Sequence, residues 1–73
     1  MSEPTFAICI SNFGYEASLE LRKLYEILPD ADAGSMNQMR IIDESGEDYL
    51  YPDKFFVIVH LPEAIEKKIL HAA

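Results

Sequence analysis

Residues 38–61 read QMRIIDESGEDYLYPDKFFVIVHL and carry the clearest secondary-structure signals of the chain. The first part of this stretch contains two β-rich segments on either side of residues 44–46, where a glycine can adopt the left-handed conformation of a bulged hairpin turn. Because strand side chains alternate between faces, Tyr49 and Tyr51 share one face of the second segment. The pattern predicts a β-hairpin that ends near Tyr51.

Further strands are predicted on both sides of this hairpin. Residues 52–55 begin with proline and can form one tight turn. Residues 56–61 are rich in β-branched and aromatic side chains, which is typical of a buried strand. Upstream, residues 6–11 are apolar and β-rich, and they end at Asn12 and Gly14, which favour a turn.

Residues 16–28 are ambiguous. Their larger apolar side chains follow the i, i+3, i+4, i+7 spacing of one helix face: Leu21, Leu24, Tyr25 and Leu28. Residues 23–28 also read as a strand in which Tyr25 and Ile27 point the same way. Local propensity favours a helix, and both alternatives stay open at this point.

Residues 29–37 combine Pro, Gly, Ser, Asn and two Asp, which predicts a loop. Asp30 and Asp32 resemble the start of a calcium-binding loop. However, the twelfth position of that pattern is Ile41 rather than glutamate, so we interpret the two aspartates as solvated loop carboxylates.

The C-terminal segment predicts a helix over residues 62–71. Pro62 suits the first helical turn, and Glu63 favours the positive end of the helix dipole. Ile65 and Ile69 lie four residues apart and form a narrow apolar stripe, which we expect to pack on the rest of the domain.

Composition limits the classes of protein that are possible. The 73 residues correspond to one small domain, and an apolar content of 49% argues against a disordered acidic tail. Six Lys and Arg against thirteen Asp and Glu give a net charge of −7, spread over both halves of the chain. Phosphate would be repelled, so we expect no nucleic acid ligand and favour a neutral or basic protein partner.

Cysteine and histidine content restricts the possible chemistry. One Cys and two His exclude an intramolecular disulfide and a zinc site built from four Cys and His ligands. The N-terminus lacks the basic flank of a signal peptide, and no apolar run approaches a membrane span. We therefore expect a cytoplasmic protein with no metal, no cofactor and no membrane association.

Residues 49–57, YLYPDKFFV, resemble the end of an SH3 domain. In that family a strand reaches a proline, makes one 3₁₀ turn that bears an aromatic residue, and enters the last strand. Pro52 matches the family's proline position and Phe55 its tyrosine position. The resemblance implies a mainly β fold, a five-stranded SH3-like small barrel over about residues 5–61, followed by a helix over about 62–72.

This resemblance favours a strand within the ambiguous segment, because tertiary pairing can override helical propensity. The alternative is an α+β fold in which a helix at 16–28 packs on a three- to four-stranded antiparallel sheet. Residues 43–52, DESGEDYLYP, are also similar to the signature of a family of small uncharacterised bacterial proteins. That second resemblance implies a free-standing bacterial domain and no known activity.

SH3 domains bind polyproline helices in an aromatic groove that usually includes a tryptophan. This chain has no tryptophan, and Phe55 offers no hydroxyl. An aromatic face can still form from Phe13, Tyr15, Tyr49, Tyr51 and Phe55. We expect the residues that contact a partner to be Tyr49, Tyr51, Phe55, Glu47 and Asp48, because tyrosine is enriched at interfaces and the nearby acids suit a basic or proline-rich peptide.

The leading hypothesis is a non-enzymatic protein-interaction module that is a monomer or a weak homodimer. One alternative is an acidic regulatory subunit that masks a basic partner protein. Another is a small hydrolase or transferase in which His60 activates Cys9 as a nucleophile. Cys9 lies between two isoleucines, however, and a cysteine in such a setting usually behaves as a small hydrophobic residue.

Overall fold

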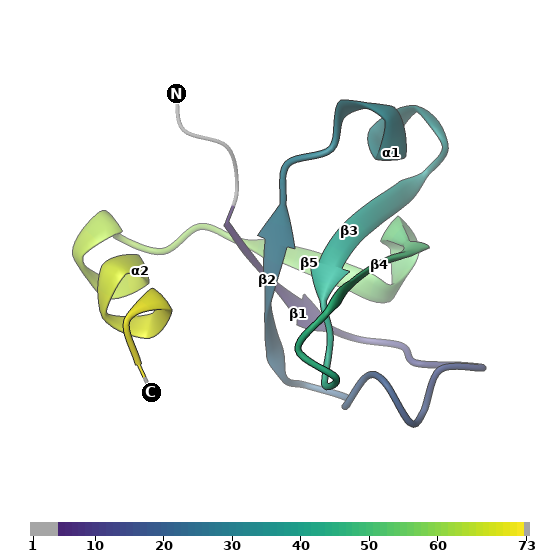
Figure 1. Ribbon diagram of the computed structural model, residues 1–73, viewed down its shortest axis with the longest axis horizontal. Helices are drawn as coiled ribbons and strands as arrows, with labels where there is room; N and C mark the ends of the chain where they lie inside the picture. Colours follow the sequence, from purple (N-terminus) through teal and green to yellow (C-terminus); the bar gives the residue numbers. More distant parts are fainter. Residues whose placement is uncertain (1–4, 73) are drawn as a thin grey trace.

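The computed structural model describes residues 5–72. Its elements are β1 (Phe6–Cys9), β2 (Leu24–Leu28), α1 (Ala31–Ser35), β3 (Gln38–Ile42), β4 (Asp48–Pro52), the 3₁₀ turn η1 (Asp53–Phe55), β5 (Phe56–Val59) and α2 (Glu63–Leu70). Within this range, five antiparallel strands form one sheet in the order β4-β3-β2-β1-β5 (Figure 1). The predictions of a mainly β fold, of the hairpin and of a short C-terminal helix are confirmed.

The sheet is not closed. Among the described residues, β4 and β5 each have a hydrogen-bonded neighbour on one side only, so they are the two edges of the sheet. The closed SH3-like barrel that the sequence predicts is therefore not confirmed, although η1 connects the two edge strands across one end of the core.

Residues 16–28 do not form a helix, so the alternative α+β fold is wrong. The backbone makes a single turn in which the N–H groups of Ser18 and Leu19 donate to the Tyr15 carbonyl, at 2.9 and 3.0 Å. Arg22 then adopts a left-handed φ of 65°, which a right-handed helix cannot contain. β2 follows and pairs with β1 on one side and β3 on the other, and this pairing overrides the helical spacing.

The loop predicted at residues 29–37 contains a short helix, α1, so the prediction is wrong for that part. Asp30 is the N-cap, and its carboxylate accepts hydrogen bonds from the N–H groups of Asp32 and Ala33, both at 3.1 Å. Ala33 is buried and anchors the helix. An aspartate cap followed by Ala-Asp-Ala was the signal for this helix.

The hydrophobic core lies on one face of the sheet, where strand register brings alternate side chains together. It consists of Ala7, Cys9, Leu19, Tyr25, Ile41, Tyr51, Phe55 and Phe56. Aromatic edges meet ring faces within it: the Tyr51 centroid lies 5.0 Å from that of Tyr15 and 6.3 Å from that of Phe56. Tyr51 at the end of the hairpin and Phe56 at the start of β5 are therefore both part of the core.

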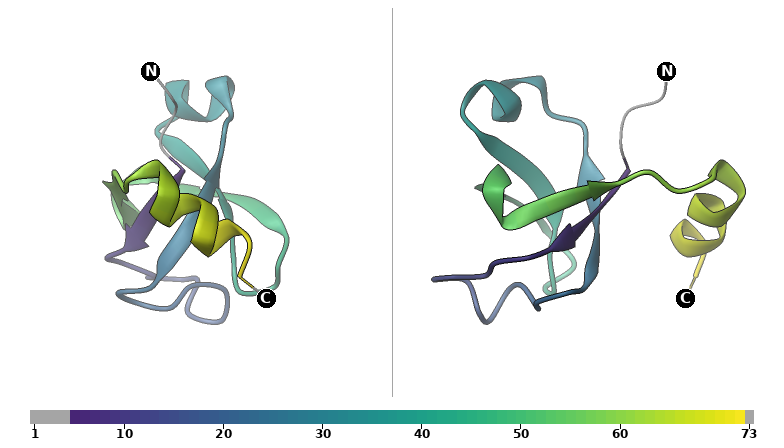
Figure 2. Two further views of the ribbon diagram at one scale, coloured as in Figure 1. Left: turned by 90° about the vertical axis from the view of Figure 1, so that its left-hand side faces the viewer. Right: turned by 180° about the vertical axis from the view of Figure 1, so that it is seen from behind.

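Helix α2 forms as predicted, but the expectation that it packs on the sheet is wrong. No residue of Glu63–Leu70, all of which are described, is buried. Figures 1 and 2 show α2 standing beyond the end of β5. Pro62 has φ −57° and ψ 143° and restricts Leu61 before it to extended conformations, so the connector leads the chain past the sheet before the helix begins.

Candidate partner-binding site

The structure divides the predicted contact residues into a buried and an exposed set. Tyr51 and Phe55 are only 1% and 7% exposed, so the expectation that they form an exposed surface is wrong. Tyr49 is 53% exposed, and Glu47 and Asp48 are exposed beside it. The two tyrosines do share one face of β4, but Tyr51 is covered by neighbouring rings whereas Tyr49 lies next to the hairpin turn.

Tyr49 borders a hollow of about 390 Å³, which we call the tyrosine groove; it is lined by Tyr15, Gln38, Arg40, Asp48, Tyr49 and Leu50. The rings of Tyr15 and Tyr49 are tilted by 54°, with centroids 6.3 Å apart. Tyr15 comes from the loop after β1, where its N–H donates to the Asn12 carbonyl at 2.8 Å. The groove therefore joins a loop to the β3–β4 hairpin, and sequence reasoning missed Gln38, Arg40 and Leu50 as part of it.

Charges at the tyrosine groove are partly neutralised. Arg40 donates through Nε to Asp30 and through Nη1 to Asp48, at 2.8 and 2.7 Å. The hydrogen bond with Asp30, and then that with Asp48, raises the pKa of Arg40. Hydrogen bonding to Arg40 in turn holds the pKa of Asp30 below its usual range. The Asp30 carboxylate thus caps α1 and pairs with Arg40. These two contacts account for the carboxylate without a calcium ion.

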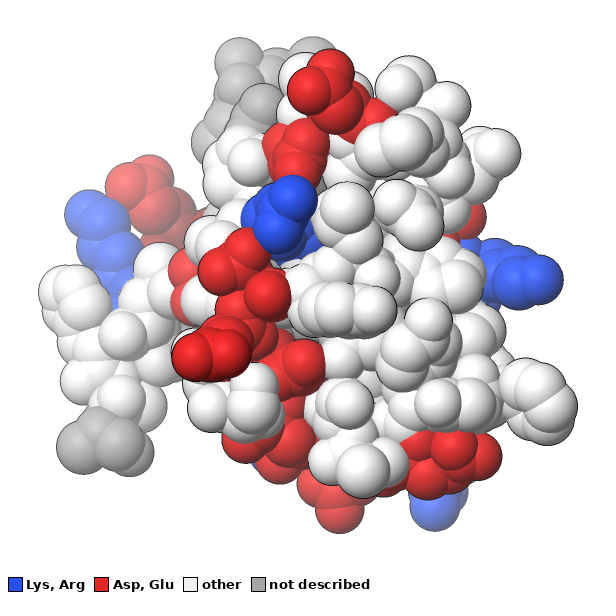
Figure 3. Space-filling model, turned by 45° about the vertical axis from the view of Figure 1, so that its right-hand side comes forward, with Lys and Arg blue, Asp and Glu red and all other residues white. Residues whose placement is uncertain are grey.

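The remaining charge around the groove is negative. Arg40 balances one of its two carboxylate partners, which leaves one negative charge, and Glu47 adds another beside Asp48. Figure 3 shows that acidic side chains form a band across this side of the molecule. A cationic ligand would be attracted to this band, and a phosphate would be repelled.

The acidic residues of the hairpin turn bind two core tyrosines. Asp43 accepts a hydrogen bond from the Tyr51 hydroxyl at 2.6 Å and two from Ser45. Partial burial acts to raise the pKa of Asp43, but the hydrogen bonds from Ser45 and Tyr51 outweigh it and hold that pKa below the usual range. Burial, with a further contribution from the hydrogen bond to Asp43, raises the pKa of Tyr51 to about 12.

Glu44 binds the hydroxyl of the second core tyrosine, Tyr25, as Asp43 binds that of Tyr51. Its carboxylate accepts from Lys23 Nζ at 2.8 Å and from the Tyr25 hydroxyl at 2.7 Å. The hydrogen bond from Lys23, and then that from Tyr25, lowers the pKa of Glu44. Burial is the main cause of the raised pKa of Tyr25, whose oxygen also accepts the Glu20 N–H. The DES tripeptide at residues 43–45 therefore attaches the hairpin turn to the core.

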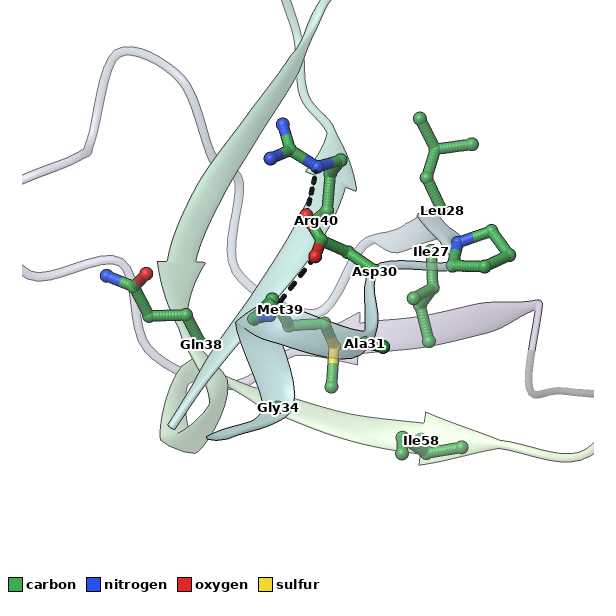
Figure 4. A pocket seen from close by; sticks show the side chains of 11 residues that line it. Ile27, Leu28, Asp30, Ala31, Gly34, Gln38, Met39, Arg40 and Ile58 are labelled. Atoms are coloured by element: carbon green, nitrogen blue, oxygen red, sulfur yellow. Dashed lines mark hydrogen bonds and ion pairs between the residues drawn. The ribbon is translucent and has the colours of Figure 1, made fainter. Parts of the chain in front are cut away.

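A second hollow of about 320 Å³ lies between α1, β2, β3 and β5 (Figure 4). Its walls are mostly apolar and include Ile27, Met39 and Ile58, and the Arg40–Asp30 ion pair borders it. Because that pair is mutually neutralised, the hollow offers apolar contact area rather than a reactive group.

The structure does not bring the predicted nucleophile and base together. Cys9 is completely buried, its thiol donates to the Ser11 carbonyl at 3.2 Å, and burial raises its pKa. Cys9 lies opposite Phe56 in the sheet, whereas His60 follows four residues later, a separation of about 13 Å along an extended chain. The prediction of a Cys9–His60 pair is therefore wrong.

Residues 5–72 contain no grouping of three or more His, Cys, Asp or Glu side chains placed to hold a metal ion. Within the same range, no helix has the length and apolar character that crossing a membrane requires. The comparison with protein-family models gives no match, and the searches of curated proteins and of solved structures give no significant match.

Proposed function

We propose that this protein is a non-enzymatic protein-interaction module whose tyrosine groove binds a short, neutral or basic, extended segment of a partner protein. The observation that carries the proposal is Tyr49, which is half exposed on a strand paired with β3 and has its ring against Tyr15. Tyrosine supplies a large contact area at low cost in conformational entropy, so it is frequent among the residues that dominate binding energy.

The proposal includes a relationship to the SH3-like fold. In support of it, the sheet runs in the order β4-β3-β2-β1-β5, and η1 with Pro52 before it stands ahead of the last strand. The groove also lies between a long loop and a hairpin, which is a suitable place for an extended peptide. Phe55, however, contributes to the core rather than to the groove.

The carboxylates beside the groove determine which peptide segments it would favour in this proposal. Asp48 lines the groove and the exposed Glu47 precedes it in the chain, so Lys or Arg in the partner segment would be attracted and an acidic segment would be repelled. The net charge of −7 disfavours nucleic acid for the same reason. The single thiol fits a reducing compartment, and we place the module in the cytoplasm.

The test is an NMR titration of the ¹⁵N-labelled protein. The probes are a proline-rich dodecapeptide with two arginines and the same peptide with glutamates in their place. We expect the basic peptide to shift amide resonances of the groove residues and the acidic peptide to bind much more weakly. Shifts confined to other surfaces, or no shift with millimolar basic peptide, would refute the proposal.

A matched pair of variants tests the site itself. Tyr49→Ala removes the exposed ring and should weaken binding about tenfold or more, as expected for a residue that dominates an interface. Leu70→Ala removes an apolar side chain of similar exposure, 45% against 53%, from α2 and should leave binding unchanged. Tyr51 is unsuitable for this purpose, because its truncation would damage the core.

The acidic band supports a second candidate, a regulator that masks a basic partner protein. Association driven by opposed surface charges weakens as salt screens them. With a basic protein such as lysozyme as the probe, binding that is equally strong at low and at high salt would count against this candidate. Salt-sensitive binding that survives Tyr49→Ala would favour it over the groove.

A further inference from the structure

The two edge strands of the sheet differ in how they are protected. β4 carries Asp48, ends at Pro52 and is flanked by Glu47 and Asp53, and charges and proline at an edge prevent pairing with another chain. β5 reads FVIV and has no charge and no proline. Val57 and Ile58 are 51% and 40% exposed on it, so the prediction of a buried strand is wrong for these two residues, and this edge has neither a charge nor a proline to prevent pairing.

Hydrogen bonding shows which backbone groups of β5 remain available. The Ile10 N–H donates to the Phe55 carbonyl at 2.7 Å, and strand pairing places Ile8 opposite Val57. Because antiparallel pairs alternate, Val57 faces β1 with its backbone groups, and Ile58 directs its N–H and C=O to the outer side. Among residues 5–72, no strand pairs with that side of β5.

We propose that the protein forms a two-fold symmetric homodimer through antiparallel pairing of β5 with β5 of a second copy. The register is set by Ile58, which lies opposite its own copy and exchanges both N–H···O=C hydrogen bonds with it. By the same alternation the Phe56 carbonyl points outward and accepts the His60 N–H of the second copy, whereas the Phe56 N–H already donates to the Asp53 carbonyl in η1.

The distribution of charge favours a second copy of this chain as the partner of β5. Residues 1–59 carry four basic and eleven acidic side chains, 4 − 11 = −7, whereas residues 60–73 carry two of each, 2 − 2 = 0. β5 itself is uncharged, so β5 and α2 form a neutral region on an otherwise acidic molecule. Two identical chains can meet there without bringing their acidic surfaces together.

Helix α2 extends the contact. Three residues separate it from the end of β5, and Ile65, Ile69 and Leu70 are 36–45% exposed. In an antiparallel pair the chain that leads into each α2 passes the start of the partner's β5, so the exposed apolar side chains of α2 are available to the second copy. The residues of the tyrosine groove belong neither to β5 nor to α2, so a dimer leaves both grooves open.

Light scattering after size-exclusion chromatography tests the assembly. We expect the protein at 100 µM to have about twice the monomer mass of 8.3 kDa. Ile58→Lys places like charges at the two-fold axis and should give the monomer mass. Leu21→Lys changes the total charge equally at a loop residue that is 50% exposed, and it should remain dimeric. A wild-type monomer at this concentration would overturn the proposal.

Cross-linking tests the register even where Ile58→Lys fails to fold. Two Ile58 residues that form a hydrogen-bonded pair have Cα atoms about 5.5 Å apart, within disulfide range. Ile58→Cys should therefore give a covalent dimer under mild oxidation, whereas Val57→Cys, offset from its own copy, should cross-link at least tenfold more slowly. Equal rates, or a dimer that only loss of α2 disrupts, would refute β5 pairing.

Discussion

The hydrogen bond between Tyr51 and Asp43 supplies the sharpest test of the structure, through the substitution Tyr51→Phe. The change removes one hydroxyl and leaves the buried ring in place. That hydroxyl donates to the Asp43 carboxylate at 2.6 Å. A hydrogen bond to a charged group contributes about 1.5–3 kcal/mol, and we take the lower end, because Asp43 is only partly buried and keeps its bonds from Ser45.

The expected loss is therefore about 1.5 kcal/mol at pH 7, which corresponds to a fall in Tm of roughly 6–12 °C for a domain of this size. The pKa of Asp43 is lowered in the folded protein. Its contribution is therefore present above the unfolded pKa of about 3.9 and is lost as the pH falls through the lower folded value. The cost of Tyr51→Phe should shrink correspondingly between pH 5 and pH 3.

Raising the pH should also reduce the stabilising contribution, this time through ionisation of the Tyr51 hydroxyl. Its folded pKa is raised to about 12, so its stabilising contribution is present below the unfolded pKa near 10 and is lost as the pH rises through 12. The phenylalanine variant lacks this ionisation, so the difference in stability from the wild type should also shrink above about pH 10.

Urea unfolding followed by circular dichroism at pH 7, 5, 4 and 3, and again above pH 10, measures these differences. Tyr49→Phe is the matched control, because it removes a hydroxyl from the same face of β4 at an exposed position. Its effect should stay within about 0.5 kcal/mol. The reasoning fails if the two variants cost the same at pH 7, or if the cost of Tyr51→Phe is undiminished at pH 3.

The remaining predictions concern the hairpin turn and the thiol. Glu44→Gln should cost about 1 kcal/mol in urea unfolding, because the Tyr25 hydroxyl loses a charged acceptor, and an unchanged midpoint would contradict this. Gly46→Ala should lower the free energy of unfolding by about 1 kcal/mol, because the φ of Gly46 is 84°. Gly34→Ala, within α1, should be neutral or stabilising. Equal effects of the two substitutions in urea unfolding would count against the turn geometry. Cys9 should resist alkylation in the native protein and react in denaturant, as followed by mass spectrometry, and rapid native labelling would show an open core.

Much of the secondary structure was predictable from local patterns. The hairpin follows from alternating side chains around Gly46, and the last strand from the apolar run after Pro52. The C-terminal helix follows from its proline start and the spacing of Ile65 and Ile69. These elements form where the local preferences of the residues agree with the final structure.

The candidate site was only half predictable. Tyr49, Glu47 and Asp48 could be placed on an exposed hairpin, but the two tyrosines of β4 have the same local pattern and opposite burial. The difference arises in the tertiary structure: Tyr15, which is distant in sequence, and Phe56 both pack against Tyr51, whereas Tyr49 has Tyr15 on one side and stays half exposed. The pairing of Arg40 with Asp30 and Asp48 was equally invisible, since it joins three separate segments.

Composition and periodicity thus determine that this is a small, acidic, mainly β domain with a helical end, because those properties depend on residues close together in the chain. The choice of strand over helix at residues 24–28, the open sheet and the detached α2 depend on contacts between distant segments. Backbone pairing on both sides of β2 outweighs its helical spacing, and Pro62 restricts Leu61 to extended conformations, so the chain passes the end of the sheet before α2 begins. Local sequence does not encode the energies of such contacts, so tertiary structure alone settles them.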